Sequence, residues 1–172
     1  NYADGTSTGM TTSTTGNTIF RLYGLDAQNS GNGPNLYLDN MTFTGCGTPS
    51  PATISKSFSP AMIAAGQVST LTFTLSNPNG TNLTGAAFTD SLPGDLTVAT
   101  PANLSNTCGG TFNASGSQIS LSGGTIPPAG CALSVNVTGS TAGIFTNTSG
   151  FLSTTEGGTN TSETGYGTSV LA

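Results

Sequence analysis

Apolar and polar residues alternate in short runs along residues 50–172. In the clearest run, residues 68–76, Leu71, Phe73 and Leu75 are separated by threonines. A period of two places such side chains on one face of an extended strand. The same kind of pattern predicts strands at residues 53–58, 85–90, 96–99, 118–121, 132–138, 143–148 and 168–171.

Turn residues separate these predicted strands. Examples are NPNG at residues 77–80 and LPGD at residues 92–95, where proline and glycine favour turn conformations. No segment has the spacing of apolar residues that marks a helix. Short strands recurring about every ten residues predict an all-β fold, an immunoglobulin-like antiparallel β-sandwich.

A boundary precedes the sandwich. The sequence GTPSP at residues 47–51 contains two prolines, which cannot enter a helix or a central strand. We therefore expect an N-terminal β-strand extension at residues 1–47, a Pro-rich hinge at 48–51 and the immunoglobulin-like β-sandwich at 52–172. The extension is either a donor strand for another molecule or the remnant of an upstream domain.

Two strong strand patterns lie in the extension, at residues 18–25 and 35–43. Two strands cannot enclose a core, and open strand edges recruit other strands. The pair resembles the last two strands of a jelly-roll or lectin-like domain. The side chains expected to contact a neighbouring subunit are Ile19, Phe20, Leu22, Tyr23, Leu36, Leu38, Met41 and Phe43.

Three arrangements of this extension are open. Docking onto the next copy of the chain is a head-to-tail contact, which propagates into a filament. Alternatively, the extension ends an upstream domain of a longer polypeptide, or it packs on the sandwich of its own chain.

The sandwich region also carries a family resemblance. The segments ATISKSFSP at 52–60, STLTFTLSNPN at 69–79 and FTDSLPGDLTV at 88–98, with the contexts of Cys108 and Cys131, resemble the repeated immunoglobulin-like modules of large bacterial surface proteins, the DUF11-like group. The resemblance spans about residues 50–172. It implies an extracellular structural or adhesive module with no catalytic residues.

Ionisable side chains are few, with seven acids, two basic residues and no histidine. Histidine-based catalysis and histidine zinc sites are therefore excluded. Arg21 and Lys56 alone cannot form a nucleic-acid groove, and no apolar run is long enough to predict a membrane span. A surface of hydroxyls and amides is typical of extracellular chains. We expect a cell-surface protein that is not an enzyme and uses neither a cofactor nor a metal.

The chain has three cysteines, which is consistent with an extracellular protein. Cys108 and Cys131 both lie at strand margins within one module, and we predict a disulfide between them. It closes a loop of about 22 residues, worth roughly 3 kcal/mol. Cys46 is then a free thiol or half of a bond to another molecule.

Lys56, the sole lysine, lies on the first predicted strand of the sandwich. Some immunoglobulin-like surface adhesins join such a lysine to an asparagine across the sheet, beside a buried acid. The candidates here are Asn160 with Glu156 or Glu163. The simpler interpretation is a solvated lysine.

The aspartates allow two further hypotheses. Asp4, Asp26 and Asp39 carry oxygens suited to calcium, although turn capping is the simpler role. Asp90 and Asp95 flank a Leu-Pro-Gly turn, where paired carboxylates can act on a glycosidic bond or simply hold the turn.

Two features of the sequence allow an association with carbohydrate. Tyrosines can stack on sugars, which makes Tyr2, Tyr23, Tyr37 and Tyr166 candidates for a glycan-binding platform. The asparagines in Asn-x-Ser/Thr sequences are candidate glycosylation sites, namely Asn40, Asn79, Asn82, Asn103, Asn113, Asn136, Asn147 and Asn160.

The sequence thus predicts a structural subunit of an extracellular bacterial filament or surface fibre, assembled by β-strand addition between copies of itself. The alternative is a carbohydrate-binding or adhesive module of a larger cell-surface protein, with surface glycans as partners.

Overall fold

The computed structural model describes residues 48–161 and 167–172. The chain divides into two units, Asn1–Gly47 and Thr48–Ala172, and the described residues all belong to the second. This division falls within the GTPSP sequence. The predicted N-terminal strands, their eight docking side chains and Cys46 lie outside the described residues.

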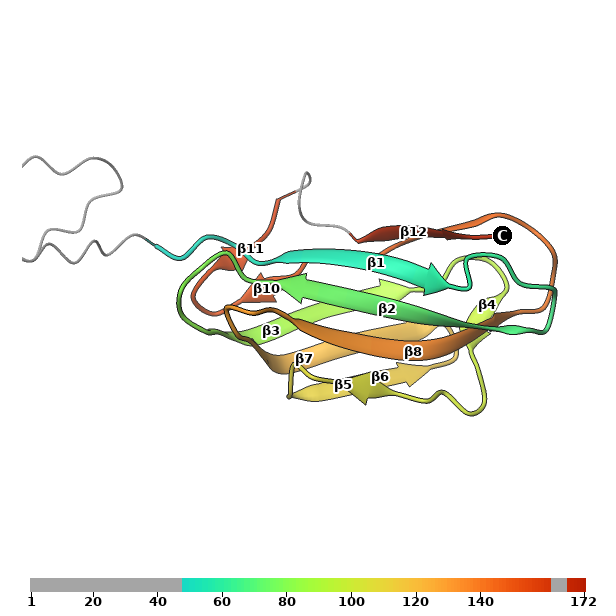
Figure 1. Ribbon diagram of the computed structural model, residues 1–172, viewed down its shortest axis with the longest axis horizontal. Coiled ribbons are helices and arrows are strands. Elements are labelled where there is room, and N and C mark those ends of the chain that lie inside the picture. Colours follow the sequence, from blue (N-terminus) through green and yellow to red (C-terminus); the bar gives the residue numbers. More distant parts are fainter. Residues whose placement is uncertain (1–47, 162–166) are drawn as a thin grey trace, which may run out of the picture. The chain divides into compact units, whose positions relative to one another are not determined.

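Two antiparallel sheets and a short additional strand pair make up the described part of the chain (Figure 1). The first has the strand order β1-β2-β8-β4, with β5 also paired to β8. Its strands are β1 (Thr53–Ser59), β2 (Val68–Ser76), β8 (Cys131–Gly139), β4 (Leu96–Val98) and β5 (Ser105–Asn106). The long central pair, β2 and β8, keeps an unbroken register from Val68 opposite Thr138 to Leu75 opposite Cys131.

The second sheet has the order β11-β10-β3-β7-β6. Its strands are β11 (Gly158–Thr159), β10 (Ser153–Thr154), β3 (Leu83–Ser91), β7 (Gln118–Ile126) and β6 (Thr111–Ser115). The register between β3 and β7 shifts on either side of Ala86. Gly85 and Gly123 both have positive φ angles, of 64° and 66°, and glycine adopts that conformation without the strain of a side chain.

A short strand pair forms a third sheet. β9 (Phe145–Thr148) and β12 (Thr168–Leu171) pair antiparallel, and β12 lies beside β1. Asp90 in β3 forms an isolated bridge with Ser149, immediately after β9. The pair therefore lies where the β1 edge of the first sheet approaches β3 of the second.

Both sheets contribute to one hydrophobic core. From β2 it takes Leu71, Phe73 and Leu75, all fully buried, and the Phe73 and Phe88 rings pack at 5.0 Å. Burying each such side chain stabilises the fold by about 1.5–3 kcal/mol. The alternation seen in the sequence of β2 is therefore the alternation between core and surface.

The prediction of an all-β, immunoglobulin-like antiparallel β-sandwich is confirmed. β2 spans the predicted residues 68–76, and β12 spans the predicted 168–171. β7 continues to Ile126, beyond the predicted 118–121, because its glycines interrupt the apolar alternation without ending the strand. Strands β5, β6, β10 and β11 were not predicted.

Candidate functional site

The most unusual group of side chains lies between the sheets. Lys56 of β1, Asp90 of β3 and Asn147 of β9 meet in the interior, and we refer to them as the Lys56 cluster. The side chains of Lys56 and Asp90 are fully buried, and Asn147 has no exposed surface. Buried charges are rare in proteins unless they are paired.

All three side chains meet at one oxygen atom. Lys56 Nζ donates to Asp90 Oδ2 at 2.7 Å, and Asn147 Nδ2 donates to the same oxygen at 3.0 Å. The alternation of each strand explains the burial, since Lys56 is in phase with Ile54 and Phe58, and Asp90 is in phase with Phe88. An amine, a carboxyl group and a carboxamide thus lie within hydrogen-bonding reach of one point.

The electrostatics of the cluster are dominated by burial. Desolvation lowers the pKa of Lys56 from its usual 10.5, against the raising effects of the hydrogen bond and the charge of Asp90. Lys56 Nζ also lies 5.4 Å from the centroid of the Phe73 ring. The interior therefore makes the neutral amine more accessible than it is in water.

Two oxygen atoms in the cluster lack partners. Asp90 Oδ1 and Asn147 Oδ1 are buried, and neither has a hydrogen bond among the described residues. Unpaired buried polar atoms cost free energy and are uncommon in folded proteins. Two of them on adjacent side chains therefore need an explanation.

Ser149, just after β9, and Gly167, just before β12, lie next to the cluster, since Ser149 forms a bridge with Asp90 and Gly167 lies against Lys56. Gly167 N donates to Ser149 Oγ at 3.1 Å, and Ser149 N donates to Gly167 O at 3.0 Å. An added β-carbon on Gly167 would lie 2.6 Å from Lys56 Cγ. Position 167 therefore has room only for glycine while Lys56 keeps this conformation.

Several sequence-based interpretations are corrected by this geometry. Lys56 is buried, so the simpler interpretation of a solvated lysine was wrong. The buried acid beside it is Asp90 and not Glu156, which is exposed and accepts a hydrogen bond from Thr84 N at 2.6 Å.

The other two candidates for the predicted bond to Lys56 are Asn160 and Glu163. Asn160 Oδ1 accepts a hydrogen bond from Leu152 N at 2.8 Å, and Asn160 Nδ2 donates one to Ala52 O at 3.2 Å. Glu163 lies outside the described residues.

The aspartates flanking the turn do not act as a pair. Asp90 belongs to the Lys56 cluster, whereas Asp95 is exposed and accepts a hydrogen bond from Thr141 Oγ1 at 2.8 Å. Asp4, Asp26, Asp39 and the tyrosines proposed to bind glycans, Tyr2, Tyr23, Tyr37 and Tyr166, lie outside the described residues. Within residues 48–161 and 167–172, no group of three His, Cys, Asp or Glu side chains is placed to hold a metal ion.

The candidate glycosylation sites differ in accessibility. Asn82, Asn103 and Asn113 are exposed, and Asn79 and Asn136 are half-buried. Asn147 and Asn160 are buried, so the folded chain cannot carry glycans there, and the prediction for these two positions was wrong. Asn40 lies outside the described residues.

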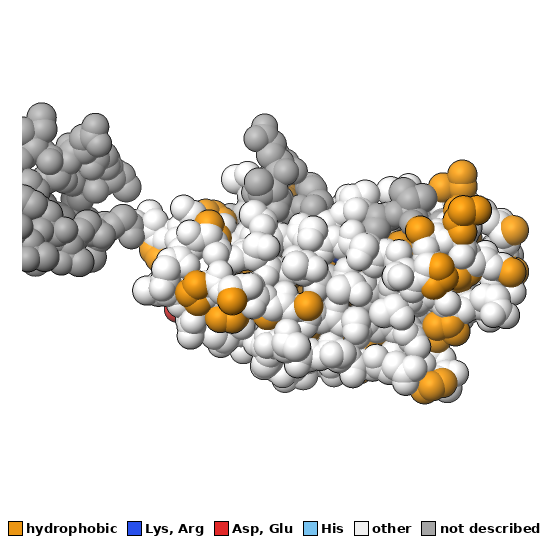
Figure 2. Space-filling model, in the orientation of Figure 1, with side chains coloured by type: hydrophobic (Ala, Val, Ile, Leu, Met, Phe, Trp, Pro, Cys, Tyr) orange, Lys and Arg blue, Asp and Glu red, His pale blue; other side chains and the backbone are white. Residues whose placement is uncertain are grey.

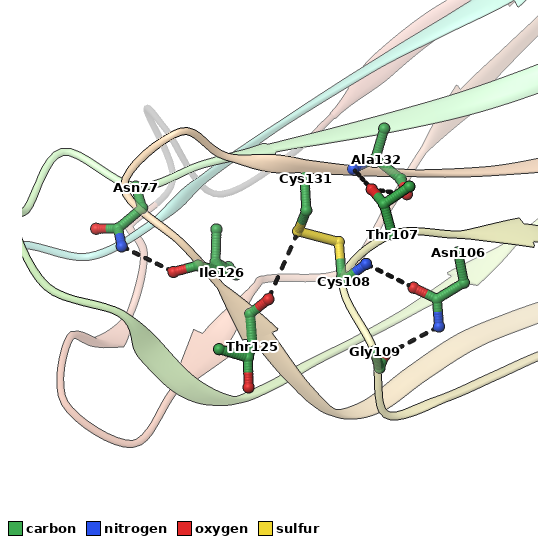
Figure 3. The surroundings of a disulfide bond; sticks show 9 residues. All are labelled: Asn77, Asn106, Thr107, Cys108, Gly109, Thr125, Ile126, Cys131 and Ala132. Atoms are coloured by element: carbon green, nitrogen blue, oxygen red, sulfur yellow. Dashed lines mark hydrogen bonds between the residues drawn. A yellow bond between two sulfur atoms is a disulfide. The ribbon is translucent and has the colours of Figure 1, made fainter.

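The predicted disulfide is present. Cys108 and Cys131 are joined, with their Cα atoms 5.2 Å apart. Figure 3 shows that the bond ties the loop before β6 to the start of β8, next to Thr125 of β7. Cys108 N donates to Asn106 Oδ1 at 2.8 Å, and Ala132 N donates to Thr107 Oγ1 at 2.8 Å. These bonds fix the loop independently of the sulfur atoms.

A second surface feature lies at one end of the sandwich, which we call the apolar end. Met62 and Ile144 are 76% and 77% exposed there. Beside them is a shallow pocket of about 60 Å³ lined by Ile63, Leu96, Gly139, Phe145 and Ala172, among others. Figure 2 shows apolar side chains gathered at this end of a surface that is otherwise mostly uncharged and polar.

The apolar end lies away from the start of the sandwich. The chain enters β1 at the opposite end, whereas Ala172 lies at the apolar end (Figure 1). Ile63 N donates to Ala172 O at 2.9 Å, and Ala172 N donates to Ala61 O at 3.0 Å. No helix among the described residues is long and apolar enough to cross a membrane.

One protein-family model matches residues 52–167, and its description is "Domain of unknown function (DUF7933)". Among curated proteins, none matches the chain significantly. The DUF11-like resemblance stays a prediction.

Three solved structures are similar to parts of the chain. A non-cellulosomal cohesin from the hyperthermophilic archaeon Archaeoglobus fulgidus is 15% identical, with a TM-score of 0.44, over 70% of this chain and 91% of that one. A collagen-binding domain from a Staphylococcus aureus adhesin is 10% identical, with a TM-score of 0.42, over 74% and 99%.

The third is a GH20 exo-β-N-acetylglucosaminidase from Vibrio harveyi. It is 13% identical, with a TM-score of 0.38, over 72% of this chain and 18% of that one. With TM-scores below 0.5, these likenesses carry no functional argument.

Proposed function

The chain belongs to the DUF7933 family, and we propose that it is a structural subunit of an extracellular filament or surface fibre. In this proposal the strands predicted at residues 18–25 and 35–43 of one copy dock at the apolar end of the next. The observation that carries it is the apolar end itself, which lies opposite the end where the chain enters β1.

Exposed apolar side chains in a cluster mark interaction surfaces. Met62 and Ile144 are more than three-quarters exposed, beside a pocket that is lined mainly by apolar side chains. The predicted occupant has matching chemistry, because its docking residues include Ile19, Phe20, Leu36 and Phe43. Burying several such side chains is favourable enough to offset the ordering of the segment.

Strand β6 has an open edge that an incoming strand can use near the apolar end. Within the described residues, β6 pairs on one side only, with β7. Val98 N donates to Gly116 O, just after β6, at 2.7 Å, and Leu96 of the same β4 strand lines the apolar pocket. An incoming strand can therefore pair with β6 while its side chains reach the apolar end.

Composition and the disulfide support an extracellular setting. Disulfides persist in oxidising compartments, and charged residues make up only 5% of the chain. A surface of hydroxyls and amides offers few charged groups, so association relies on apolar contacts and backbone hydrogen bonds.

The test compares the assembly of the chain of residues 1–172 with that of two variants. We expect light scattering and negative-stain microscopy to show head-to-tail assemblies of the wild type. The double substitution Met62→Ser with Ile144→Ser should return the chain to monomers. A chain that stays monomeric at 17.0 kDa at high concentration contradicts the proposal.

Leu104→Ser is the matched control. Leu104 is 46% exposed, but it directly precedes β5, which pairs with Leu133 and Ser134 in the other half of β8 from Gly139. This variant should assemble like the wild type. Equal loss of assembly in both variants would indicate a general effect of removing surface apolar groups and would also contradict the proposal.

A further inference from the structure

The Lys56 cluster holds an amine, a carboxamide and a carboxyl group in an interior shielded from water. A stabilising ion pair alone explains Lys56 and Asp90, but it leaves Asp90 Oδ1 and Asn147 Oδ1 without partners. It also leaves unexplained why a carboxamide shares the single oxygen that the lysine binds. An amide-forming reaction needs groups of these three kinds, namely an amine, a carboxamide and a proton carrier.

We propose that Lys56 and Asn147 become joined by an amide bond between Lys56 Nζ and Asn147 Cγ, with Asp90 as the proton carrier and ammonia as the leaving group. The inference rests on residues other than those of the apolar end and is independent of the filament proposal.

The reaction begins with a proton transfer. In the ion pair, Lys56 Nζ lies 2.7 Å from Asp90 Oδ2, so a proton passes directly between them. Burial favours the neutral amine over the ammonium ion, and it lowers the pKa of Lys56 accordingly. The amine then has a free electron pair and is a nucleophile.

The carboxylic acid of Asp90 activates the carboxamide. Half a turn about the Cβ–Cγ bond of Asn147 exchanges its Oδ1 and Nδ2 atoms, so that Oδ1 faces the proton on Asp90. This hydrogen bond gives a partner to an oxygen that otherwise has none. It also withdraws electrons from Cγ and stabilises the negative charge that develops on Oδ1 during attack.

The remaining steps balance without an oxidant or a reductant. Nζ attacks Cγ to give a tetrahedral intermediate, Asp90 carries a proton from Nζ to Nδ2, and the Cγ–Nδ2 bond breaks to release ammonia. Asp90 then gives ammonia the proton that it first took from Lys56 and returns to a carboxylate. An ammonium side chain and a carboxamide are converted into a secondary amide and an ammonium ion. Burial excludes water, which would otherwise compete with Nζ for the activated carboxamide.

The bond would connect strands that lie far apart in the sequence. β1 is the first strand of the sandwich, whereas β9 pairs with β12, the last described strand. A side chain at position 167 would overlap the stem of Lys56, so the glycine there leaves room for the lysine. The fold therefore positions the reactants without any enzyme from outside.

The first test is the intact mass of the chain of residues 1–172, reduced, denatured and produced in a host that does not glycosylate it. We expect a mass about 17 Da below that of the sequence, the loss of one ammonia. An unchanged mass overturns the proposal. Because this measurement uses the wild type, it does not depend on any variant folding.

Digestion with trypsin tests whether Lys56 takes part in the reaction that releases ammonia. The chain has two cleavage sites, after Arg21 and after Lys56. A lysine joined through Nζ is not cleaved, so we expect fragments 1–21 and 22–172 only, with Arg21 as the internal control. Cleavage after Lys56 overturns the proposal even if ammonia is lost, since cyclisation of an asparagine before a glycine, such as Asn79, also releases ammonia.

Asp90→Asn keeps the shape of the side chain and removes the proton carrier. We expect this variant to have the full mass and to be cleaved after Lys56. Asp95→Asn is the matched control, because Asp95 is exposed and hydrogen-bonded to Thr141, and it should retain the loss of ammonia. A bond that forms equally in Asp90→Asn contradicts the role of Asp90.

Discussion

Gly167 lies directly against the stem of Lys56, so that a β-carbon at position 167 would be 2.6 Å from Lys56 Cγ and 2.8 Å from Lys56 Cδ. Lys56 cannot easily move aside, because its side chain is buried and its Nζ is bound to Asp90. The missing side chain of Gly167 is thus what allows a long lysine side chain to fit beneath β12.

Gly167→Ala should therefore destabilise the fold by about 1–3 kcal/mol, the usual cost of forcing extra atoms into a packed interior. The measurement is the urea concentration at which half of the chain of residues 1–172 is unfolded. Gly80→Ala is the control, because a β-carbon there meets nothing within 4 Å, and its midpoint should barely change. Equal effects at the two positions would show that close packing against Lys56 is not the cause.

Removing the disulfide should cost about 3 kcal/mol, since it closes a loop between residues 23 apart in the sequence. The comparison is between the single variant Cys46→Ser, which keeps the disulfide, and a triple variant that also carries Cys108→Ser and Cys131→Ser. Cys46 is replaced in both so that no other thiol interferes. Reductant should lower the urea midpoint of the first protein and leave that of the second unchanged. A midpoint insensitive to reductant in both would contradict the assignment.

Asn160→Ala should destabilise the fold by about 1–3 kcal/mol. Asn160 Oδ1 accepts a hydrogen bond from Leu152 N, which is buried and would lose its partner. Asn82→Ala, at an exposed position, should change the free energy of unfolding by less than about 0.5 kcal/mol. If both variants unfold at the wild-type urea concentration, the buried hydrogen bonds of Asn160 do not contribute to stability.

Glu156 gives the fold a measurable dependence on acid. Hydrogen bonds from the side chain and backbone of Thr84 lower the pKa of Glu156 from its usual 4.5. A carboxyl group with a lowered pKa in the folded state stabilises the fold above its unfolded value, and that contribution is lost as the pH falls through the folded value. Below pH 4.5 the wild type should therefore lose more stability than Glu156→Gln.

Urea midpoints measured from about pH 6 to about pH 3 test this difference. Thr84→Val removes one of the two donors and should show a pH dependence between those of the wild type and Glu156→Gln. Superimposable curves for all three proteins would mean that the contact with Thr84 does not form in solution. The effect is small, because Glu156 lies on the surface.

The sequence predicted the long strands well because each has one buried face. The alternation of Leu71, Phe73 and Leu75 predicted β2 to the residue. β6 was missed because it is short and its inward residues, Phe112 and Ala114, differ greatly in size and are only partly buried. β10 and β11 have two residues each, too few to show any period.

The Lys56 cluster could not be predicted from spacing, because Asp90 is 34 residues from Lys56 and 57 from Asn147. Only the pairing of strands brings them together. A signal was nevertheless present in the pattern. Lys56 falls in phase with the core residues Ile54 and Phe58, and a charged residue at an inward position needs a buried partner.

The placement of β12 beside β1 has a consequence for a chain pulled at both ends. Gly167 lies against Ser55 and Lys56, and Ala172 bonds Ala61 and Ile63, so the two segments run in the same direction. Tension entering before β1 and leaving at Ala172 therefore acts as shear along their whole contact, and the contact must rupture at once instead of unzipping. Resistance to stretching then depends on the barrier to unfolding, which equilibrium stability does not reveal.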